Sequence, residues 1–405
     1  MAAKGRILGL AAVVVAATLV AFPLLSGLAG GGPTAIVYME SGADDDRTRI
    51  VVEGLVVPQG EEPDRQVFQI THERGFMPRG VLSPDGNRVA LVRQPKGVTD
   101  REGAEAIVLE TSGNGAGVVT VLPVPAFGLS TPVFPPTGND WVYVTSAALA
   151  SPAPEDEEMR SGHLAEYVFT IHQVQLSNYA VSTRLEQRLA YLHPIGVGKV
   201  LVAPRTVGEA LLVYRVTHGG GNVAWLNIFD HEPPTVLANL GFAMARSFDL
   251  TDSRDALIFS SSDPGEAEGR IQALYLSRGG LPVQLGGPVP REASPIWAGT
   301  SRNWFFSRVP DGRGGDTPQL PMQLFHASDR QPTGVPLDSL SAMTGLAPAA
   351  EVPIEGGASP GGRFVAVRAN TEEGMVHLLR DTVDPESART LGEGQDGVIR
   401  ILGFR

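Results

Sequence analysis

Short apolar strands separated by turn residues recur from about residue 35 to the end of the chain. The clearest unit starts at Gly80, passes the turn Ser83-Pro84-Asp85-Gly86 and continues as Val89-Ala90-Leu91-Val92. Proline presets the second position of a turn, aspartate suits the third, and glycine accepts the positive φ that follows. Because the strand after the turn is apolar on successive residues, we expect both of its faces to be buried.

Weaker copies of this unit follow, and their post-turn strands begin at Trp141, Ala256, Trp304 and Phe364. The last copy has a degraded turn that starts with Ser359 and Pro360. Two more units, at residues 34–39 and 200–214, fit when the turn varies. The units lie about 55 residues apart on average, and two further β-rich stretches follow each one. This pattern predicts four-stranded antiparallel sheets that must stack to bury their faces, which is typical of β-propeller blades.

The two ends of the repeat region complement each other. The first unit begins at its second strand, Ala35 to Met39, and the chain ends with one lone strand, residues 398–402. Pairing these two strands would complete a blade and remove an exposed sheet edge. We therefore predict an all-β propeller over residues 31–405 that is closed by strand 398–402, with Ile401 near Val37. Seven blades are expected and six are the alternative, because the unit marked by Ala210 is the least regular.

The Ser83-Pro84-Asp85-Gly86 turn and its degraded copy at Ser359 and Pro360 resemble the WD40-like (PD40) repeats of TolB-type β-propellers. This resemblance implies the propeller fold and the habit of such envelope proteins of binding other proteins or peptides. It also implies that these six residues are structural turn residues. The N-terminal α/β domain of TolB itself has no counterpart between Gly30 and Ala35, so a Tol-system function is not implied.

An uncharged apolar run follows Lys4 and Arg6 and extends from Ile7 to about Leu28. A run of this length can cross a bilayer as a helix, and a cleaved signal peptide has the same basic start and apolar middle. We predict that residues 1–30 are a membrane anchor or a signal peptide. In either case the rest of the chain lies on the extracytoplasmic side, either tethered or secreted.

Composition narrows the possible partners. The chain has 32 Lys and Arg against 44 Asp and Glu, a net charge of -12, so a nucleic acid is not an expected partner. Cysteine is absent, which excludes disulfides, thiolate metal sites and cysteine catalysis. The eight histidines form no HExxH or other close metal pair, and no GxSxG elbow occurs. We therefore assign no catalytic residue, metal or cofactor.

Four residues are candidates for a binding rim, since loops between strands carry function in many folds. Arg215 and His218 precede a run of glycines, and Asp230 and His231 form a second polar pair. Ordinary solvent-exposed hairpin residues are the competing interpretation. The segment from Leu340 to Glu355 is predicted to be a flexible loop.

Three functional hypotheses remain open. The first is a membrane-tethered propeller that binds or scaffolds an envelope protein or peptide. The second is an extracytoplasmic glycosidase or lactonase, because a ring can bring distant carboxylates together at its central channel. The third is a purely structural surface protein. Whether the protein is an enzyme is left open, with the non-enzymatic function favoured.

Overall fold

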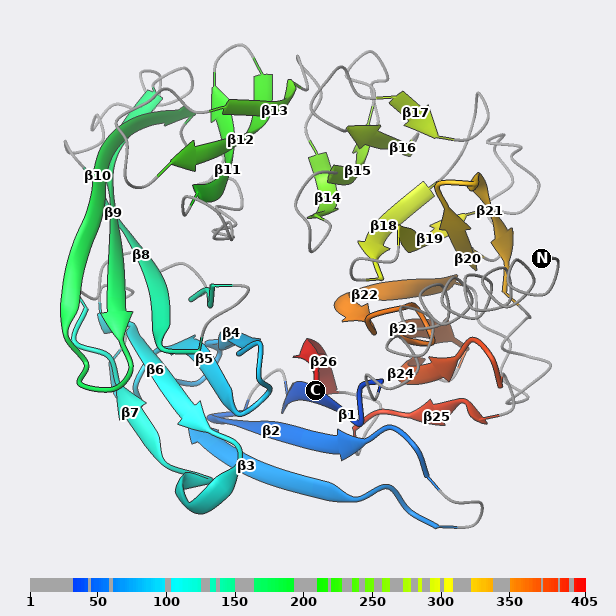
Figure 1. The fold of residues 1–405 in the computed structure, drawn as a ribbon, viewed down its shortest axis with the longest axis horizontal. Coiled ribbons are helices and arrows are strands. Elements are labelled where there is room, and N and C mark those ends of the chain that lie inside the picture. Colours follow the sequence, from blue (N-terminus) through cyan, green and yellow to red (C-terminus); the bar gives the residue numbers. More distant parts are fainter. Residues whose placement is uncertain are drawn as a thin grey trace, which may run out of the picture.

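The computed structural model shows a chain of β-strands arranged in antiparallel sheets (Figure 1). The structure describes residues 32–42, 45–57, 61–98, 103–124, 132–135, 139–149, 164–192, 210–217, 220–227, 235–239, 245–250, 257–262, 272–277, 283–285, 292–298, 302–308, 322–337, 350–372, 374–384, 387–392 and 397–405. The predicted membrane segment, residues 1–30, lies outside these ranges. Within them, no helix has the length and apolar character needed to cross a membrane.

The first sheet joins segments from the two ends of the chain. Its strand order is β26-β1-β2-β3, and the strands span Gly397–Phe404, Ala35–Gly42, Arg47–Gly54 and Arg65–Thr71. Strand β26 runs antiparallel to β1, with Ile401 opposite Tyr38 and Gly403 opposite Val37. The strand near the C-terminus thus completes the sheet that β1 begins, and it is longer than the predicted range 398–402.

Four other sheets contain four strands each, paired in chain order. The second sheet consists of β4 (Arg79–Leu82), β5 (Arg88–Arg93), β6 (Glu105–Glu110) and β7 (Val119–Val121), with the short 3-10 helix η2 (Gly113–Gly115) before β7. The others consist of β14 (Ala245–Leu250), β15 (Leu257–Ser262), β16 (Gln272–Ser277) and β17 (Val283–Leu285); of β18 (Glu292–Trp297), β19 (Asn303–Arg308), β20 (Gln323–Ser328) and β21 (Gln331–Pro336); and of β22 (Ala350–Ala358), β23 (Phe364–Thr371), β24 (Gly374–Asp381) and β25 (Arg389–Thr390).

Two further sheets show three strands in the described ranges. One contains β8 (Trp141–Leu149), β9 (Leu164–Gln175) and β10 (Val181–Leu192), and the other contains β11 (Ala210–Thr217), β12 (Gly220–Asn227) and β13 (Thr235–Asn239). An isolated bridge pairs Val133 with Tyr143 of β8. It therefore marks the position of a fourth strand in the first of these sheets.

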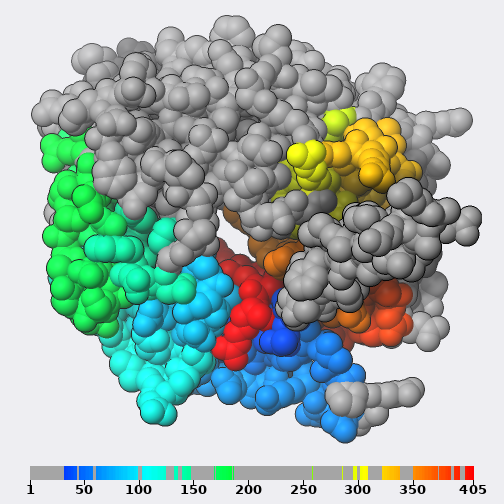
Figure 2. All heavy atoms as spheres, viewed as in Figure 1, coloured from blue at the N-terminus to red at the C-terminus, as the bar shows by residue number. Residues whose placement is uncertain are grey.

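The sheets stand around a common centre (Figure 1). Strands β4, β14, β18, β22 and β26 lie nearest to this centre, and we call them the inner strands. The space-filling view shows a hollow in the middle of this face, bordered in part by the red atoms of the C-terminal strand (Figure 2).

Strand β5 shows why each sheet needs two neighbours. Val89 and Leu91 pack in a core with the first sheet, and Ala90 and Val92 pack in another core with the sheet of β8. All four side chains are buried. The prediction that both faces of this strand are covered is therefore confirmed. Equivalent cores lie between the sheets of β18 and β22 and between the sheets of β22 and β1.

The turn between β4 and β5 is held by its own side chains. The Ser83 hydroxyl donates to Asp85 Oδ1 at 2.6 Å and accepts the Arg88 N–H at 2.9 Å. Gly86 donates its N–H to the Ser83 carbonyl and has a φ of +72°, where a side chain would be strained. The copy beginning at Ser359 repeats the pattern, because its hydroxyl accepts the Phe364 N–H at 2.9 Å.

The prediction of a loop from Leu340 to Glu355 is wrong for its last part. Residues 350–355 belong to strand β22, which pairs with β23 from Ala350 to Pro353. The register then shifts, and the next pair is Ala358 with Val365. Residues 354–357 therefore form a bulge on an inner strand, and a bulge interrupts the alternation by which a strand is recognised in a sequence.

Candidate functional site

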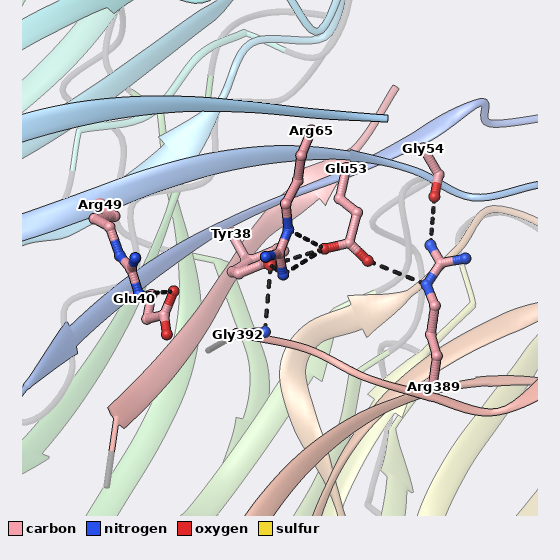
Figure 3. A network of polar contacts seen from close by, with 8 residues as sticks. All are labelled: Tyr38, Glu40, Arg49, Glu53, Gly54, Arg65, Arg389 and Gly392. Carbon is pink, nitrogen blue, oxygen red and sulfur yellow. Dashed lines mark hydrogen bonds and ion pairs between the residues drawn. The ribbon is translucent and has the colours of Figure 1, made fainter. Parts of the chain in front are cut away.

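The first polar cluster lies where the sheet of β22 meets the first sheet, and we call it the closure seam. It consists of Tyr38, Glu53, Arg65, Arg389 and Gly392, with the neighbouring pair Glu40 and Arg49 (Figure 3). Strand alternation points Tyr38 and Glu53 to the same face, beside a core with Phe364 and Leu379 from the neighbouring sheet.

Glu53 is the central residue of the seam, and its side chain is completely buried. Arg65 from β3 and Arg389 from β25 each donate from Nε to the Glu53 carboxylate at 3.1 Å. The Tyr38 hydroxyl donates a third hydrogen bond at 2.9 Å. A buried carboxylate without such partners would carry a large desolvation cost, which these contacts offset.

Arg389 also binds the backbone across the seam. Its guanidinium donates to the carbonyl of Leu55 at 3.0 Å and to the carbonyl of Gly54. Arg389, on the last strand of its sheet, thus contacts both the Glu53 carboxylate and the end of β2 in the neighbouring sheet (Figure 3). This arrangement fixes the position of the two sheets relative to each other.

Tyr38 remains a donor because its surroundings oppose ionisation. Burial and then the negative charge of Glu53 raise the pKa of the Tyr38 hydroxyl far above its ordinary value. The hydroxyl oxygen accepts hydrogen bonds from Arg65 Nη2 at 3.0 Å and from the Gly392 N–H at 3.3 Å.

Gly392 is required at the seam for steric reasons. Its φ is +81°, and a Cβ at this position would lie 2.9 Å from Glu40 Oε1 and 2.8 Å from Ile399 Cδ1. Glu40 is buried and forms an ion pair with Arg49 at 2.9 Å. The seam therefore has a structural role, since its carboxylates are buried and bound by side chains of the protein.

A second buried ion pair lies at the start of β22. Glu351 and Arg380 are both almost fully buried and form an ion pair at 2.6 Å. The hydroxyl of Ser307, from the neighbouring sheet, donates to the Glu351 carbonyl. The ion pair joins β22 to β24 within one sheet, and the Ser307 hydroxyl links this sheet to its neighbour.

The second kind of polar cluster lies on the inner strands, and we call it the central charged cluster. It consists of Arg79 on β4, Arg400 on β26 and Glu355 in the bulge of β22. Arg400 donates from Nη1 to the carbonyl of Pro78 at 3.1 Å, which places its guanidinium beside the start of β4. Arg79 and Glu355 are exposed, and Arg400 is half-buried. Three segments far apart in sequence thus each contribute one charged side chain.

The bulge of β22 is what brings Glu355 to this cluster. Gly356 has a φ of +72°, and a Cβ there would lie 3.5 Å from the Ile401 carbonyl of β26. A Cβ at Gly357 would lie only 2.6 Å from the Ile354 carbonyl. The bulge therefore depends on glycine at both positions, and it packs directly against β26.

The charges of the cluster influence one another. Burial and then the positive charge of Arg79 lower the pKa of Arg400, and the negative charge of Glu355 acts in the opposite direction. The two arginines therefore repel each other, and one glutamate balances only part of their charge.

The candidate residues proposed from the sequence lie in different parts of the structure. Ser83, Pro84, Asp85 and Gly86 form the turn after β4, and Ser359 and Pro360 begin the turn after β22. Arg215 lies within strand β11, opposite Asn222, and not in a loop as expected. His218, Asp230 and His231 lie outside the described residues.

Neither the seam nor the central charged cluster was identified from the sequence. Glu53 follows the apolar residues Ile50, Val51 and Val52, and a charge at the end of such a strand was the one available signal. In the part of the chain that the structure describes, no group of three His, Asp or Glu residues could hold a metal ion.

Solved structures resemble this chain in fold. Acylaminoacyl peptidase from Pyrococcus horikoshii matches with a TM-score of 0.50 and 9% identity, over 88% of this chain and 52% of the peptidase. TolB from Acinetobacter baumannii matches with a TM-score of 0.42 and 12% identity, over 92% of this chain and 83% of TolB. A puromycin-hydrolyzing peptidase from Mycobacterium tuberculosis matches with a TM-score of 0.47 and 13% identity, over 88% and 53% of the two chains.

These similarities concern the fold alone. The chain spans about half the length of the two peptidases. No family model matches the sequence, and no curated protein matches it. The strand pairing and the match to the Pyrococcus peptidase show a β-propeller. The resemblance to TolB-type propellers that the repeat turn indicated is thereby confirmed at the level of fold.

Proposed function

We propose that this chain is a seven-bladed β-propeller that is held at the extracytoplasmic face of a membrane and binds an envelope protein or peptide. Seven antiparallel sheets among the described residues support the blade number. The apolar run from Ile7 to about Leu28 supports the membrane location. A cleaved signal, with release of the propeller, is the alternative fate of that segment.

The observation that carries the binding function is the contrast between the two kinds of polar cluster. The carboxylate of Glu53 is buried and bound by arginines from two sheets, so the seam explains how the ring is held together. Arg79 and Glu355, in contrast, are exposed on inner strands. Charged side chains that separate inner strands bring together on a rigid scaffold can bind a ligand.

Site-specific cross-linking tests the binding function. Because the chain lacks cysteine, Glu355→Cys introduces a single thiol at the inner edge, and Val383→Cys introduces one at an exposed hairpin between β24 and β25. Each full-length variant is expressed in cells and labelled with a photo-reactive group. We expect a discrete protein or peptide adduct from Glu355→Cys and none from Val383→Cys. The same adducts from both positions, or none from either, would contradict the proposal.

Localisation is tested separately. A reporter enzyme that is active only outside the cytoplasm is fused after Arg405, in chains with and without residues 1–30. We expect activity with the full chain and none without the segment. Recovery of the fusion with membranes indicates an anchor, and recovery in the soluble extracytoplasmic fraction indicates a cleaved signal. Equal activity with and without residues 1–30 would contradict the location.

A further inference from the structure

The central charged cluster has the chemistry of a site for one carboxylate. Arginine has five N–H donors, and the Pro78 carbonyl accepts a hydrogen bond from Nη1 of Arg400. Its planar guanidinium matches the two oxygens of a carboxylate. Arg79 directly follows Pro78, whose carbonyl binds Arg400, and its positive charge lowers the pKa of Arg400.

An anion between the two arginines would relieve their mutual repulsion. Arg400 is half-buried, so water screens this repulsion less than it would between two exposed side chains. Arg79 is exposed on the inner strand β4, so its guanidinium is accessible to a ligand. Binding of a negative group thus stabilises an arrangement that is electrostatically unfavourable on its own.

Glu355 restricts which anions fit. Its negative charge acts on Arg400 in opposition to Arg79, so the cluster carries a net charge of one positive unit, from two arginines and one glutamate. A single carboxylate matches this charge, whereas a multiply charged phosphate would be repelled by Glu355. The net charge of -12 over the whole chain disfavours polyanions further.

We propose that Arg79 and Arg400 bind one carboxylate of a peptide ligand at the inner edge of the ring. This inference rests on the proposed binding function, and it specifies the chemistry of the ligand. The carboxylate can be a peptide C-terminus or the side chain of an aspartate or glutamate. Both sources present the same two oxygens to the guanidinium groups.

Three short glycine-serine peptides separate these sources. One is capped at both ends, one has a free C-terminus, and one is capped but contains a single glutamate. Each is titrated into the full chain, and the Nε–Hε resonances of the arginines are followed by NMR. We expect at least one carboxylate peptide to shift the signals of Arg79 and Arg400, and the capped neutral peptide to leave them unchanged. The peptide that binds identifies the source.

Variants assign the effect to the cluster. Arg79→Gln should weaken binding about tenfold, because a charge-assisted hydrogen bond is lost. Arg330→Gln removes the same charge from the exposed turn between β20 and β21 and should leave affinity unchanged. Glu355→Gln should strengthen binding several-fold. Arg400→Lys keeps a hydrogen-bond donor and a positive charge near Pro78. Thermal unfolding of each variant shows whether the fold is retained.

The proposal is overturned if neither carboxylate peptide shifts these signals at concentrations up to about 10 mM. It is also overturned if the neutral peptide shifts them equally, or if Arg79→Gln binds as well as Arg330→Gln. A specific adduct at Glu355→Cys combined with these negative results would retain the binding function and reject only the carboxylate site.

Discussion

The closure seam and the central charged cluster are built from the same residue types but differ in burial and pairing. At the seam, Glu53 is fully buried and bound by Arg65 and Arg389. In the central cluster, Arg79 and Glu355 are exposed, and two positive charges face one negative charge. The comparison teaches that an arginine-glutamate pattern has no function of its own. Geometry decides whether it locks two sheets together or remains available to a ligand.

Removing strand β26 should break the comparison most severely, because it removes Arg400 from the central charged cluster and the Ile399 side chain that lies beside Gly392 of the closure seam. A chain ending at residue 396 lacks the buried side chains of Ile399, Ile401 and Leu402. Truncating one such side chain to alanine costs about 2 to 5 kcal/mol, and a whole domain is stable by only about 5 to 15 kcal/mol. We expect no cooperative thermal transition by near-UV circular dichroism. A melting temperature equal to that of the full chain would contradict this expectation.

Glu53→Ala tests the seam alone. It leaves Arg65 and Arg389 without their shared carboxylate, and the free energy of unfolding should fall by about 2 to 4 kcal/mol. Glu105→Ala is the matched control, because Glu105 pairs with Arg93 at 3.2 Å on a more accessible surface. That change should cost about 1 kcal/mol or less. Urea denaturation measures both, and equal losses would show that the seam has no special role.

Gly392→Ala tests the steric fit of the seam. The methyl group would meet Glu40 and Ile399 at a backbone φ of +81°. Backbone strain of this kind costs about 1 to 3 kcal/mol. Gly97→Ala provides the comparison, since Gly97 has a similar φ of +84° with no atom within 4 Å of a built Cβ. We expect the Gly392 variant to be the less stable of the two in urea denaturation, and the reverse order would contradict the crowding.

Tyr38→Phe tests the electrostatics of the seam through pH. The folded state raises the pKa of Tyr38, so the unfolded state loses this proton first as the pH rises. The contribution to stability is complete below a pH of about 10 and is lost progressively above it. We expect the stability of the Phe variant to depend less on pH above this value. If the stability of both proteins changed with pH in the same way between about pH 9 and 11.5, the result would contradict the raised pKa of Tyr38.

Arg79→Gln should have the smallest effect on stability. It tests the central charged cluster, whereas the preceding variants test the seam. Arg79 is exposed, so the free energy of unfolding should change by no more than about 0.5 kcal/mol. Its effect should instead appear in ligand binding. Chemical denaturation measures the free energy of unfolding. A loss as large as that of Glu53→Ala would show that Arg79 has a structural role.

Local features of the fold could be predicted from the sequence. The turn at Ser83 depends on neighbouring residues, and the alternation of Val89 and Ala90 between two cores follows from successive apolar positions. The position of Ile401 beside β1 could be anticipated because a sheet without its inner strand and a lone final strand complement each other. Each of these inferences uses hydrophobic burial or backbone preference, which short sequences encode directly.

The polar clusters could not be predicted in this way. Arg389 and Glu53 are 336 residues apart, and nothing near either residue specifies the other as its partner. The sequence predicts a loop that ends at Glu355, whereas the structure places this residue in a bulge of β22. Pairing of charges between neighbouring sheets depends on the completed tertiary structure, whereas strand and turn patterns do not.

The pairing of β26 with β1 has a consequence for folding kinetics. The Thr34 hydroxyl donates to the Arg405 carbonyl, a contact between residues 371 positions apart. Contacts of such long sequence separation slow folding, because chain entropy is lost before the contact contributes. A circular permutant that joins residue 405 to residue 34 by a short linker, with new termini in the turn between β20 and β21, would make this contact local. Such a chain should retain the architecture and refold faster.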